Sequence, residues 1–321
     1  MTDVLVVGEA LIDFIPEGER SLGDTETFHR RAGGAPANVA VGLARLGEPP
    51  LFRTRLSTDP FGDHLANTLS ENGVRPDLIE RDPDAATTLA FVSLDPDAER
   101  SFSFHRNGTA DTRMRADDIA DETIAGVEWV HGGGVTLADD PSRTATLDLL
   151  ERAGKAGATV SFDPNARPEL FDEGEFVEHC RRALGLVDVV KATAEDLLET
   201  GVLDGDDRDA AGLAGSICEQ GPHTALVTRG SDGALARSTP EAPWNPTDTA
   251  LVVEHGGYDV EAADTTGAGD AFTAGAIWSL AGGEPLRDAL GFANAVAALS
   301  TTEAGAMSAL PTRTDVETLR D

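Results

Sequence analysis

Short apolar runs rich in β-branched residues recur along the chain, and stretches with helical spacing lie between them. The runs occupy residues 4–7, 129–131, 159–162, 187–190 and 225–228. Continuous apolar runs of this length are typical of strands that are buried on both faces of a sheet. In the intervening residues 141–156 and 176–186, apolar side chains gather on one helical face. The alternation predicts an α/β fold with a mainly parallel central sheet and helices on both faces.

Two segments, residues 14–31 and 88–105, do not fit this alternation. In the second, period-two patterns flank the turn residues Asp95-Pro96-Asp97, which predicts a hairpin. We interpret both segments as strands of a small β-sheet lid that projects from the main sheet and covers a site. A chain of 321 residues fits one large core with such an excursion, so residues 1–321 are expected to form a single domain.

Acidic residues dominate the charge of the chain. The formal net charge is −32, and lysine occurs only at positions 155 and 191. Such an excess repels phosphate backbones, which argues against nucleic acid as a partner. It also destabilises a compact state unless salt screens the repulsion, and the screening length falls to about 3 Å at 1 M salt. The composition therefore favours adaptation to a very salty cytoplasm over the alternative of an ordinary acidic cytosolic protein.

Two cysteines, Cys180 and Cys218, stand apart and without a nearby histidine in a metal-ligand pattern. Thiols in this arrangement are typical of a reducing compartment, so a cytoplasmic location is expected. The apolar start of the chain is interrupted by Glu9 and Asp13. This pattern predicts neither a signal peptide nor a membrane span.

Residues 264–272 read Asp-Thr-Thr-Gly-Ala-Gly-Asp-Ala-Phe and lead into an apolar helical run. Glycines and consecutive N–H groups at a helix N-terminus form a concavity that attracts anions such as phosphate. The third glycine of a dinucleotide fingerprint and the G-K-[ST] of a P-loop are absent from the sequence. A carboxylate here, Asp270, suits a base that takes a proton from a substrate hydroxyl while a phosphoryl group is held nearby. The alternative is an acid favoured only by the helix dipole.

A second glycine-rich turn opens another helix at residues 31–40, Arg-Ala-Gly-Gly-Ala-Pro-Ala-Asn-Val-Ala. Together the two segments resemble the paired signatures of the ribokinase-like, or PfkB-type, carbohydrate kinases, and the resemblance extends from Val7 to Ala306. Residues 8–16, 33–47 and 162–167 are most similar to the fructokinase branch. The resemblance implies a ribokinase-like fold and an enzyme that uses ATP and Mg²⁺.

The resemblance also assigns roles to residues. It implies that Asp270 is the general base and that the anion hole is formed by Gly267, Ala268 and Gly269. It implies that sugar hydroxyls are bound by Asp13, Gly33, Gly34 and Asn38, although Asn38 could alternatively be a plain helix N-terminal residue. It implies a nucleotide site that includes Lys191, Thr193, Thr228, Gly230 and Asn294.

The family often uses an N-x-x-E pattern to organise the water shell of Mg²⁺. Here Glu195 matches the acid and would act as an outer-sphere ligand, but Ala192 stands in the asparagine position. Arg106 and Arg167 match active-site positions, where a guanidinium can hold a carboxylate or a phosphoryl group. Asp264 and Thr266 match part of a monovalent cation site. Because Ala309 replaces a frequent serine ligand there, activation by K⁺ remains open.

The leading hypothesis is transfer of the γ-phosphoryl group of ATP to a primary hydroxyl of a ketohexose, with fructose as the favoured acceptor. The first alternative is a 2-keto-3-deoxygluconate kinase, in which Arg106 or Arg167 would bind the sugar-acid carboxylate. A nucleoside or ribose kinase ranks third. A non-catalytic sugar or nucleotide sensor is the alternative from another class. The resemblance also allows a homodimer formed through the lid, and no membrane partner is expected.

Overall fold

The computed structural model describes residues 3–18, 21–94, 100–203 and 209–321. Within these ranges, nine strands form one large sheet in the order β13-β12-β11-β10-β9-β8-β1-β4-β5. Neighbours from β11 to β5 are parallel, whereas β12 and β13 are antiparallel. The strands are β1 (Val4–Val7), β4 (Leu51–Ser57), β5 (Ile79–Asp82), β8 (Trp129–Gly133), β9 (Thr159–Asp163), β10 (Val189–Ala192), β11 (Thr224–Thr228), β12 (Ala234–Ser238) and β13 (Leu251–His255).

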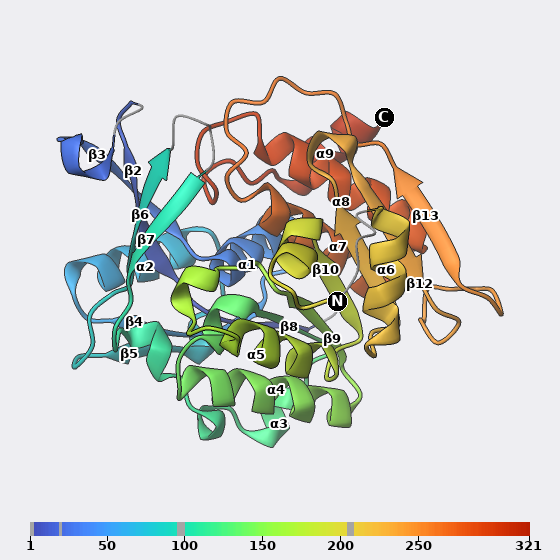
Figure 1. The fold of residues 1–321 in the computed structure, drawn as a ribbon, viewed down its shortest axis with the longest axis horizontal. Coiled ribbons are helices and arrows are strands. Elements are labelled where there is room, and N and C mark those ends of the chain that lie inside the picture. The colour runs from blue at the N-terminus through green and yellow to red at the C-terminus, as the bar shows by residue number, and fades with distance from the viewer. Residues whose placement is uncertain (1–2, 19–20, 95–99, 204–208) are drawn as a thin grey trace.

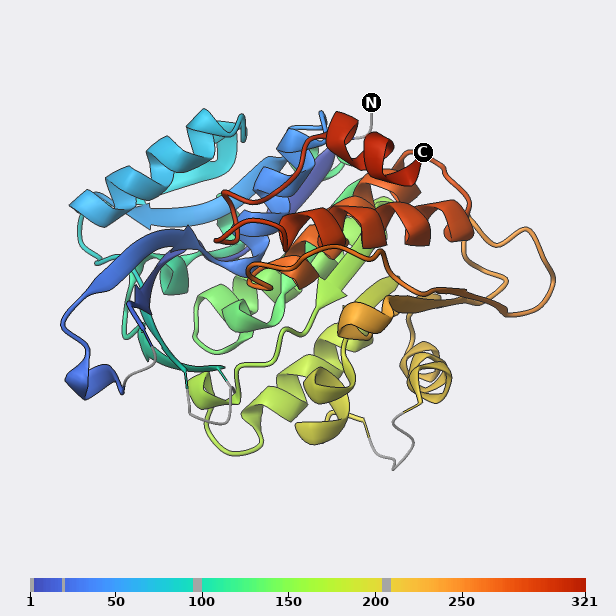
Figure 2. The same ribbon diagram turned by 90° about the horizontal axis from the view of Figure 1, so that it is seen from above.

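Helices cover both faces of this sheet, as Figure 2 shows from above. One layer contains α1 (Ala35–Arg45), α2 (Pro60–Glu71), α7 (Ala268–Ala281), α8 (Leu286–Ser300) and α9 (Arg313–Arg320). The other contains α3 (Asp121–Ile124), α4 (Ser142–Ala156), α5 (Glu175–Leu184) and α6 (Ala210–Glu219). Along β1, Val4 and Val6 pack into the first layer, while Leu5 and Val7 pack into the second. This alternation explains why the strand is apolar throughout.

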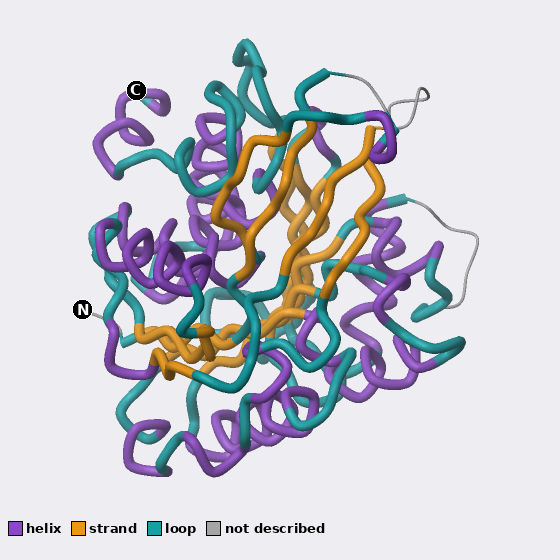
Figure 3. The backbone as a smooth tube through the Cα atoms, turned by 90° about the vertical axis from the view of Figure 1, so that its left-hand side faces the viewer, coloured by secondary structure: helices purple, strands orange, loops and turns teal. Residues whose placement is uncertain are grey.

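A smaller sheet rises beside the main one (Figure 1). In the described part of the chain its order is β3-β2-β6-β7, with β2 and β6 parallel. The strands are β2 (Leu11–Pro16), β3 (Phe28–Gly33), β6 (Leu89–Leu94) and β7 (Arg100–His105). The first pair therefore extends beyond the segment 14–31 at both ends. The turn at Asp95-Pro96-Asp97 lies outside the described residues. We call this unit, seen from its own side in Figure 3, the lid sheet.

The two faces of the lid sheet differ in what they contact. Register places Asp13 of β2 and Phe104 of β7 opposite Ala90 of β6, so these side chains share one face. Phe14 and Phe91 lie on the other face, where their rings stack at 5.0 Å. Phe14 also contacts Phe61 of α2 edge to face, at 5.9 Å. One face therefore packs toward α2, and the other presents Asp13.

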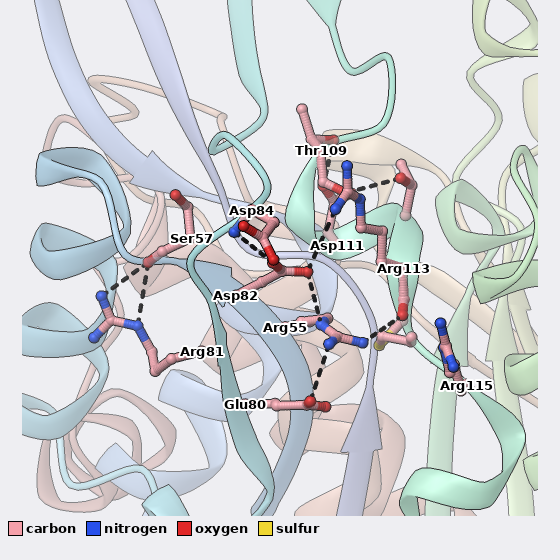
Figure 4. A network of polar contacts seen from close by, with 12 residues as sticks. Arg55, Ser57, Glu80, Arg81, Asp82, Asp84, Thr109, Asp111, Arg113 and Arg115 are labelled. Atoms are coloured by element: carbon pink, nitrogen blue, oxygen red, sulfur yellow. Dashed lines mark hydrogen bonds and ion pairs between the residues drawn. The ribbon is translucent and has the colours of Figure 1, made fainter.

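Ion pairs fix the edge of the main sheet from which the lid sheet rises (Figure 4). Arg55 of β4 contacts Glu80 and Asp82 of β5, each at 3.1 Å, and donates to the Arg113 carbonyl at 2.8 Å. The Arg81 guanidinium donates to the Ser57 carbonyl at 2.8 Å. These contacts join the two outermost parallel strands to the segment that follows the lid sheet. None of the helices in the described ranges is sufficiently long and apolar to cross a membrane.

Candidate active site

The N-terminus of α7 forms a tight turn that only glycine fits. Gly267 has a φ of 78°, and a Cβ there would lie 2.7 Å from the Cβ of Ala306. A Cβ on Gly269 would lie 3.0 Å from Nζ of Lys191. The Ala268 N–H donates to the Thr265 carbonyl at 3.2 Å. The helix N-terminus and the Lys191 ammonium therefore meet at one point, which is a favourable place for a phosphate group.

Asp270 lies in the first turn of α7, next to α1, and is half-buried. Its Oδ2 accepts a hydrogen bond of 2.7 Å from Nδ2 of Asn38. Burial raises the pKa of Asp270 to about 6, and the charge of Asp163 adds to the rise. The Asn38 hydrogen bond and the positive charges of Lys191 and Arg167 oppose it. A carboxylate with this pKa is largely ionised at neutral pH and yet basic enough to accept a proton.

Lys191 and Asp163 form a buried ion pair at the carboxyl ends of β10 and β9. Nζ of Lys191 lies 3.0 Å from Oδ2 of Asp163. Burial alone would lower the pKa of Lys191, but the carboxylates of Asp163 and Asp196 outweigh it and raise that pKa. Lys191 is therefore a fixed positive charge beside the turn at Gly269.

The second glycine turn brings the lid sheet and α1 together. A Cβ on Gly33 would lie 2.0 Å from Oδ2 of Asp13, and a Cβ on Gly34 would lie 2.6 Å from the Glu9 carbonyl. Burial raises the pKa of Asp13 to about 7, an effect that Arg167 opposes and Asp270 reinforces. In the part of the chain that is described, Oδ1 of Asn38 is buried without a hydrogen-bond partner. The turn thus sets the Asp13 carboxyl group against Gly33, and among the described residues it leaves a buried amide oxygen on α1 unsatisfied, which is unusual for a buried polar atom.

The two arginines expected at the site are held in different ways. Arg106 is only 5 % exposed, and it contacts Asp111 through Nε at 2.8 Å and Asp139 through Nη1 at 2.7 Å. Arg167 is half-buried, and its guanidinium lies 4.9 Å from the centre of the Phe102 ring. Only Arg167 therefore has a charge that is not already paired with carboxylates at contact distance among the described ion pairs.

Two residues of the site were not expected from the sequence. Glu9 is 1 % exposed, its Oε1 accepts from the Ala35 N–H at 3.2 Å, and burial raises its pKa to about 8. Oδ2 of Asp196 accepts a hydrogen bond of 2.9 Å from the Thr193 N–H. The Asp196 N–H donates to the Thr193 hydroxyl oxygen at 3.2 Å. The available signals were an acid two residues after a buried strand and a T-x-x-D capping box. The Thr193 hydroxyl is therefore already bonded to Asp196, at 2.9 Å.

The expected nucleotide and cation residues lie on separate elements. Thr228 ends β11, and Gly230 follows it with a φ of 60°. Asn294 of α8 is buried, and its Nδ2 donates to the Leu290 carbonyl at 2.8 Å. Asp264 accepts hydrogen bonds from the Thr266 hydroxyl at 2.6 Å and the Gly305 N–H at 3.0 Å, which joins two loops.

Glu195 is exposed and lines a cavity of about 580 Å³ together with Arg167. Within the described residues, no cluster of three or more His, Cys, Asp or Glu side chains is arranged to hold a metal ion. The Glu195 carboxylate is thus open to solvent at the wall of this cavity.

The fold and the site together define an enzyme that transfers a phosphoryl group to a hydroxyl group of a sugar. Residues 1–313 match the family model described as pfkB family carbohydrate kinase. The chain belongs to this family. The family match confirms the predicted resemblance, and its ribokinase-like fold is the one described above.

Curated relatives are similar over nearly the whole chain. A fructokinase from Vibrio alginolyticus is 36% identical over 98% of this chain and 98% of its own length. A probable fructokinase-2 from Arabidopsis thaliana is 38% identical over 96% of this chain and 93% of its own length.

Solved structures agree with these relatives. A fructokinase from Xylella fastidiosa with bound ATP superposes with a TM-score of 0.85 at 33% identity, covering 99% of this chain and 98% of the other. A fructokinase from Vibrio cholerae O395, solved with fructose, ADP and a calcium ion, gives a TM-score of 0.84 at 34% identity, covering 100% of this chain and 99% of the other.

Proposed function

We propose that the protein is an ATP-dependent fructokinase that transfers the γ-phosphoryl group to a primary hydroxyl of fructose. The observation that carries the proposal is the position of Asp270, a half-buried carboxylate with a pKa of about 6 beside the Lys191 ammonium and the turn at Gly269. A base and an anion site at one helix N-terminus suit phosphoryl transfer to a hydroxyl. The fructose and ADP in the Vibrio cholerae relative support this choice of substrates.

In this proposal each part of the site has a separate task. Asp270 takes the proton of the acceptor hydroxyl, while the turn formed by Gly267, Ala268 and Gly269, together with Lys191, stabilises the phosphoryl oxygens. Hydroxyl groups of the sugar bind Asp13, Asn38 and the backbone at Gly33 and Gly34. The nucleotide lies near Thr193, Thr228, Gly230 and Asn294.

Mg²⁺, bound together with ATP, would neutralise negative charge on the phosphates. The exposed Glu195 carboxylate fits an outer-sphere role toward this ion, because it faces an open cavity and forms no closed cage. Asp264 and Thr266 would contribute to a site for K⁺ in the adjacent loop, and a Vibrio cholerae relative was solved with a potassium ion.

The charges around Arg106 argue against this residue as the partner of a 2-keto-3-deoxygluconate carboxylate. A sugar acid needs a guanidinium committed to its carboxylate, since a buried unpaired charge is costly. Arg106 already contacts Asp111 and Asp139, and Glu9 lies within electrostatic range. A substrate carboxylate placed beside Arg106 would be repelled by the nearby carboxylates of Asp111, Asp139 and Glu9, and the Arg106 charge is already shared among them. A sensor without activity has no use for the base Asp270.

We also propose that the enzyme works in the cytoplasm of a cell with high internal salt, as its charge of −32 suggests. A homodimer through the lid sheet is part of the same proposal. Sedimentation of the protein at about 3 M and about 0.1 M KCl, where the screening lengths are below about 3 Å and about 10 Å, tests both statements.

The test of the function is a coupled assay with ATP, Mg²⁺ and molar KCl against fructose, 2-keto-3-deoxygluconate, ribose and adenosine. We expect fructose to give the highest kcat/KM. A preference for the sugar acid that collapses selectively in Arg106→Met would overturn the choice of fructose. A wild-type protein that binds fructose without turnover would support the sensor alternative instead.

A further inference from the structure

Arg167 faces two groups of acids. Toward the candidate active site, its positive charge lowers the pKa values of Asp13 and Asp270, against the larger effect of burial. It also lines the 580 Å³ cavity, whose walls carry further acids: Asp172, Glu173, Glu195, Asp196 and Glu199. Carboxylates on both sides attract the same guanidinium. The other contacts of Arg167 therefore decide whether its guanidinium lies toward the candidate active site or toward the cavity.

The contact that comes from another element is the ring of Phe102. Nη1 of Arg167 donates to the Ala166 carbonyl at 2.7 Å and to the Asn165 carbonyl at 3.4 Å, but both belong to its own loop. Phe102 belongs to β7 of the lid sheet, and its ring centre lies 4.9 Å from the guanidinium carbon. The half-buried Phe102 ring stacks in turn on Phe104, at 5.9 Å. An aromatic face attracts a cation at this distance.

We propose that Phe102 is a positioning residue for the reaction: its ring holds the Arg167 guanidinium toward Asp13 and Asp270 and away from the acid-lined cavity. This inference rests on the proposed sugar kinase function. Since Phe102 is part of β7, the placement of the lid sheet and the positive charge at the acceptor hydroxyl are linked. The lid sheet then contributes to the ionisation of the base as well as covering the sugar.

The effect on Asp270 must be separated from its other charged neighbours. These are Lys191 on β10, Asp163 at the end of β9, Asp13 on β2, Glu9 before β2, and Arg167. The Asn38 amide on α1 adds a hydrogen bond. Of the cations in this set, Arg167 is the one with a cation–π contact to Phe102 in the described part of the chain. Removing the Phe102 ring should therefore change the pKa of Asp270 through the position of the Arg167 charge.

The experiment compares Phe102→Leu with the wild type by carbon-13 NMR titration of the Asp270 and Asp13 carboxyl groups in the protein without ligands. Loss of the nearby positive charge raises a carboxyl pKa, so we expect both values to rise, by about half a unit for a contact of this strength. The acidic limb of kcat/KM for fructose should move in the same direction. At a pH below that limb, kcat/KM should fall about threefold.

Three matched variants make the test specific. Phe102→Tyr keeps the aromatic face and should titrate like the wild type. Phe91→Leu removes an aromatic ring from the opposite face of the lid sheet and should leave both pKa values unchanged. In Arg167→Met, the further change Phe102→Leu should have no additional effect on either pKa. Should Phe102→Leu fail to fold, Phe102→Met provides the same comparison.

Unchanged carboxyl pKa values in Phe102→Leu, with kcat/KM reduced equally at every pH, would overturn the proposal and leave Phe102 as a wall of the sugar pocket. Additive shifts in the double variant would also overturn it, because the ring would then act independently of Arg167. The NMR titration needs no substrate. A wild-type protein that fails to phosphorylate fructose would contradict the proposed function and leave the titration fully interpretable.

Discussion

Arg106 and Arg167 had the same expected role, yet they belong to two very different regions of the molecule. The region of Arg106 is closed, since two carboxylates contact the guanidinium and its side chain is 3% exposed. The region of Arg167 is open, since among the described residues the hydrogen bonds of the guanidinium go to carbonyls of its own loop, and it rests on a ring from the lid sheet. A paired buried arginine supports the fold, whereas an unpaired arginine beside a site is available to a ligand.

The largest effect should come from Asp270, the proposed base. Asp270→Asn should lower kcat by about 10²- to 10⁴-fold, because the acceptor hydroxyl loses the group that takes its proton. ATP affinity, measured by calorimetry, should stay within a few fold. Thermal stability at pH 8 should not fall, since the substitution removes a partly desolvated charge. Retention of more than about a tenth of the wild-type kcat would show that another group is the base.

Stability should separate the two arginines next. Arg106→Met leaves the buried Asp111 carboxylate without its partner and should cost about 3–5 kcal/mol of unfolding free energy. Arg167→Met breaks no buried ion pair that the structure describes and should cost less than about 1 kcal/mol. Urea denaturation in molar KCl measures both values. Equal losses of unfolding free energy in the two variants would contradict the distinction between a paired Arg106 and an unpaired Arg167.

The effects on activity should have the opposite order, with the larger loss in Arg167→Met than in Arg106→Met. Arg167→Met should reduce kcat/KM for fructose by about 10- to 100-fold, as expected for a charge-assisted hydrogen bond of about 1.5–3 kcal/mol. Arg106→Met, assayed where it is folded, should affect neutral and acidic sugars alike. Arg167→Lys keeps the charge without the planar fork and serves as the control. A larger activity loss in folded Arg106→Met than in Arg167→Met would reverse the assignment.

The fold was more accessible to sequence reasoning than the site. Apolar runs at 129–131 and 159–162 became β8 and β9, because burial on both faces leaves a continuous signal in the chain. The glycine turns before α1 and α7 were also recognisable, because a positive φ or a close approach requires glycine. Such constraints are local, so a single sequence carries them.

Side-chain partners from distant segments were not accessible. Asp139 closes the site around Arg106 from 33 positions away, and no spacing rule predicts that pairing. Glu9 was read as a polar interruption near the N-terminus, although it is buried against the start of α1. Thr193 and Asn294 had expected roles at the nucleotide, yet their polar groups bond locally to Asp196 and Leu290. Local bonding competes with ligand binding for the same atoms.

The last effect concerns pH and returns to the closed region. The folded-state pKa values of about 8 for Glu9, 7 for Asp13 and 6 for Asp270 all lie above the ordinary values of 4.5 and 3.8. The folded protein thus binds more protons than the unfolded chain, and these groups should make stability fall as pH rises from about 4 to 8.

Glu9→Gln keeps an acceptor for the Ala35 N–H and removes the highest of these pKa values. We expect its unfolding free energy to fall less steeply between pH 5 and 8, by about 1 kcal/mol per pH unit. Glu195→Gln, at an exposed position, should keep the wild-type slope. Equal slopes for Glu9→Gln and the wild type would mean that Arg106 already holds Glu9 ionised. The charges of the closed region would then be more fully paired than the Glu9 Oε2 atom suggests, which is buried without a described hydrogen-bond partner.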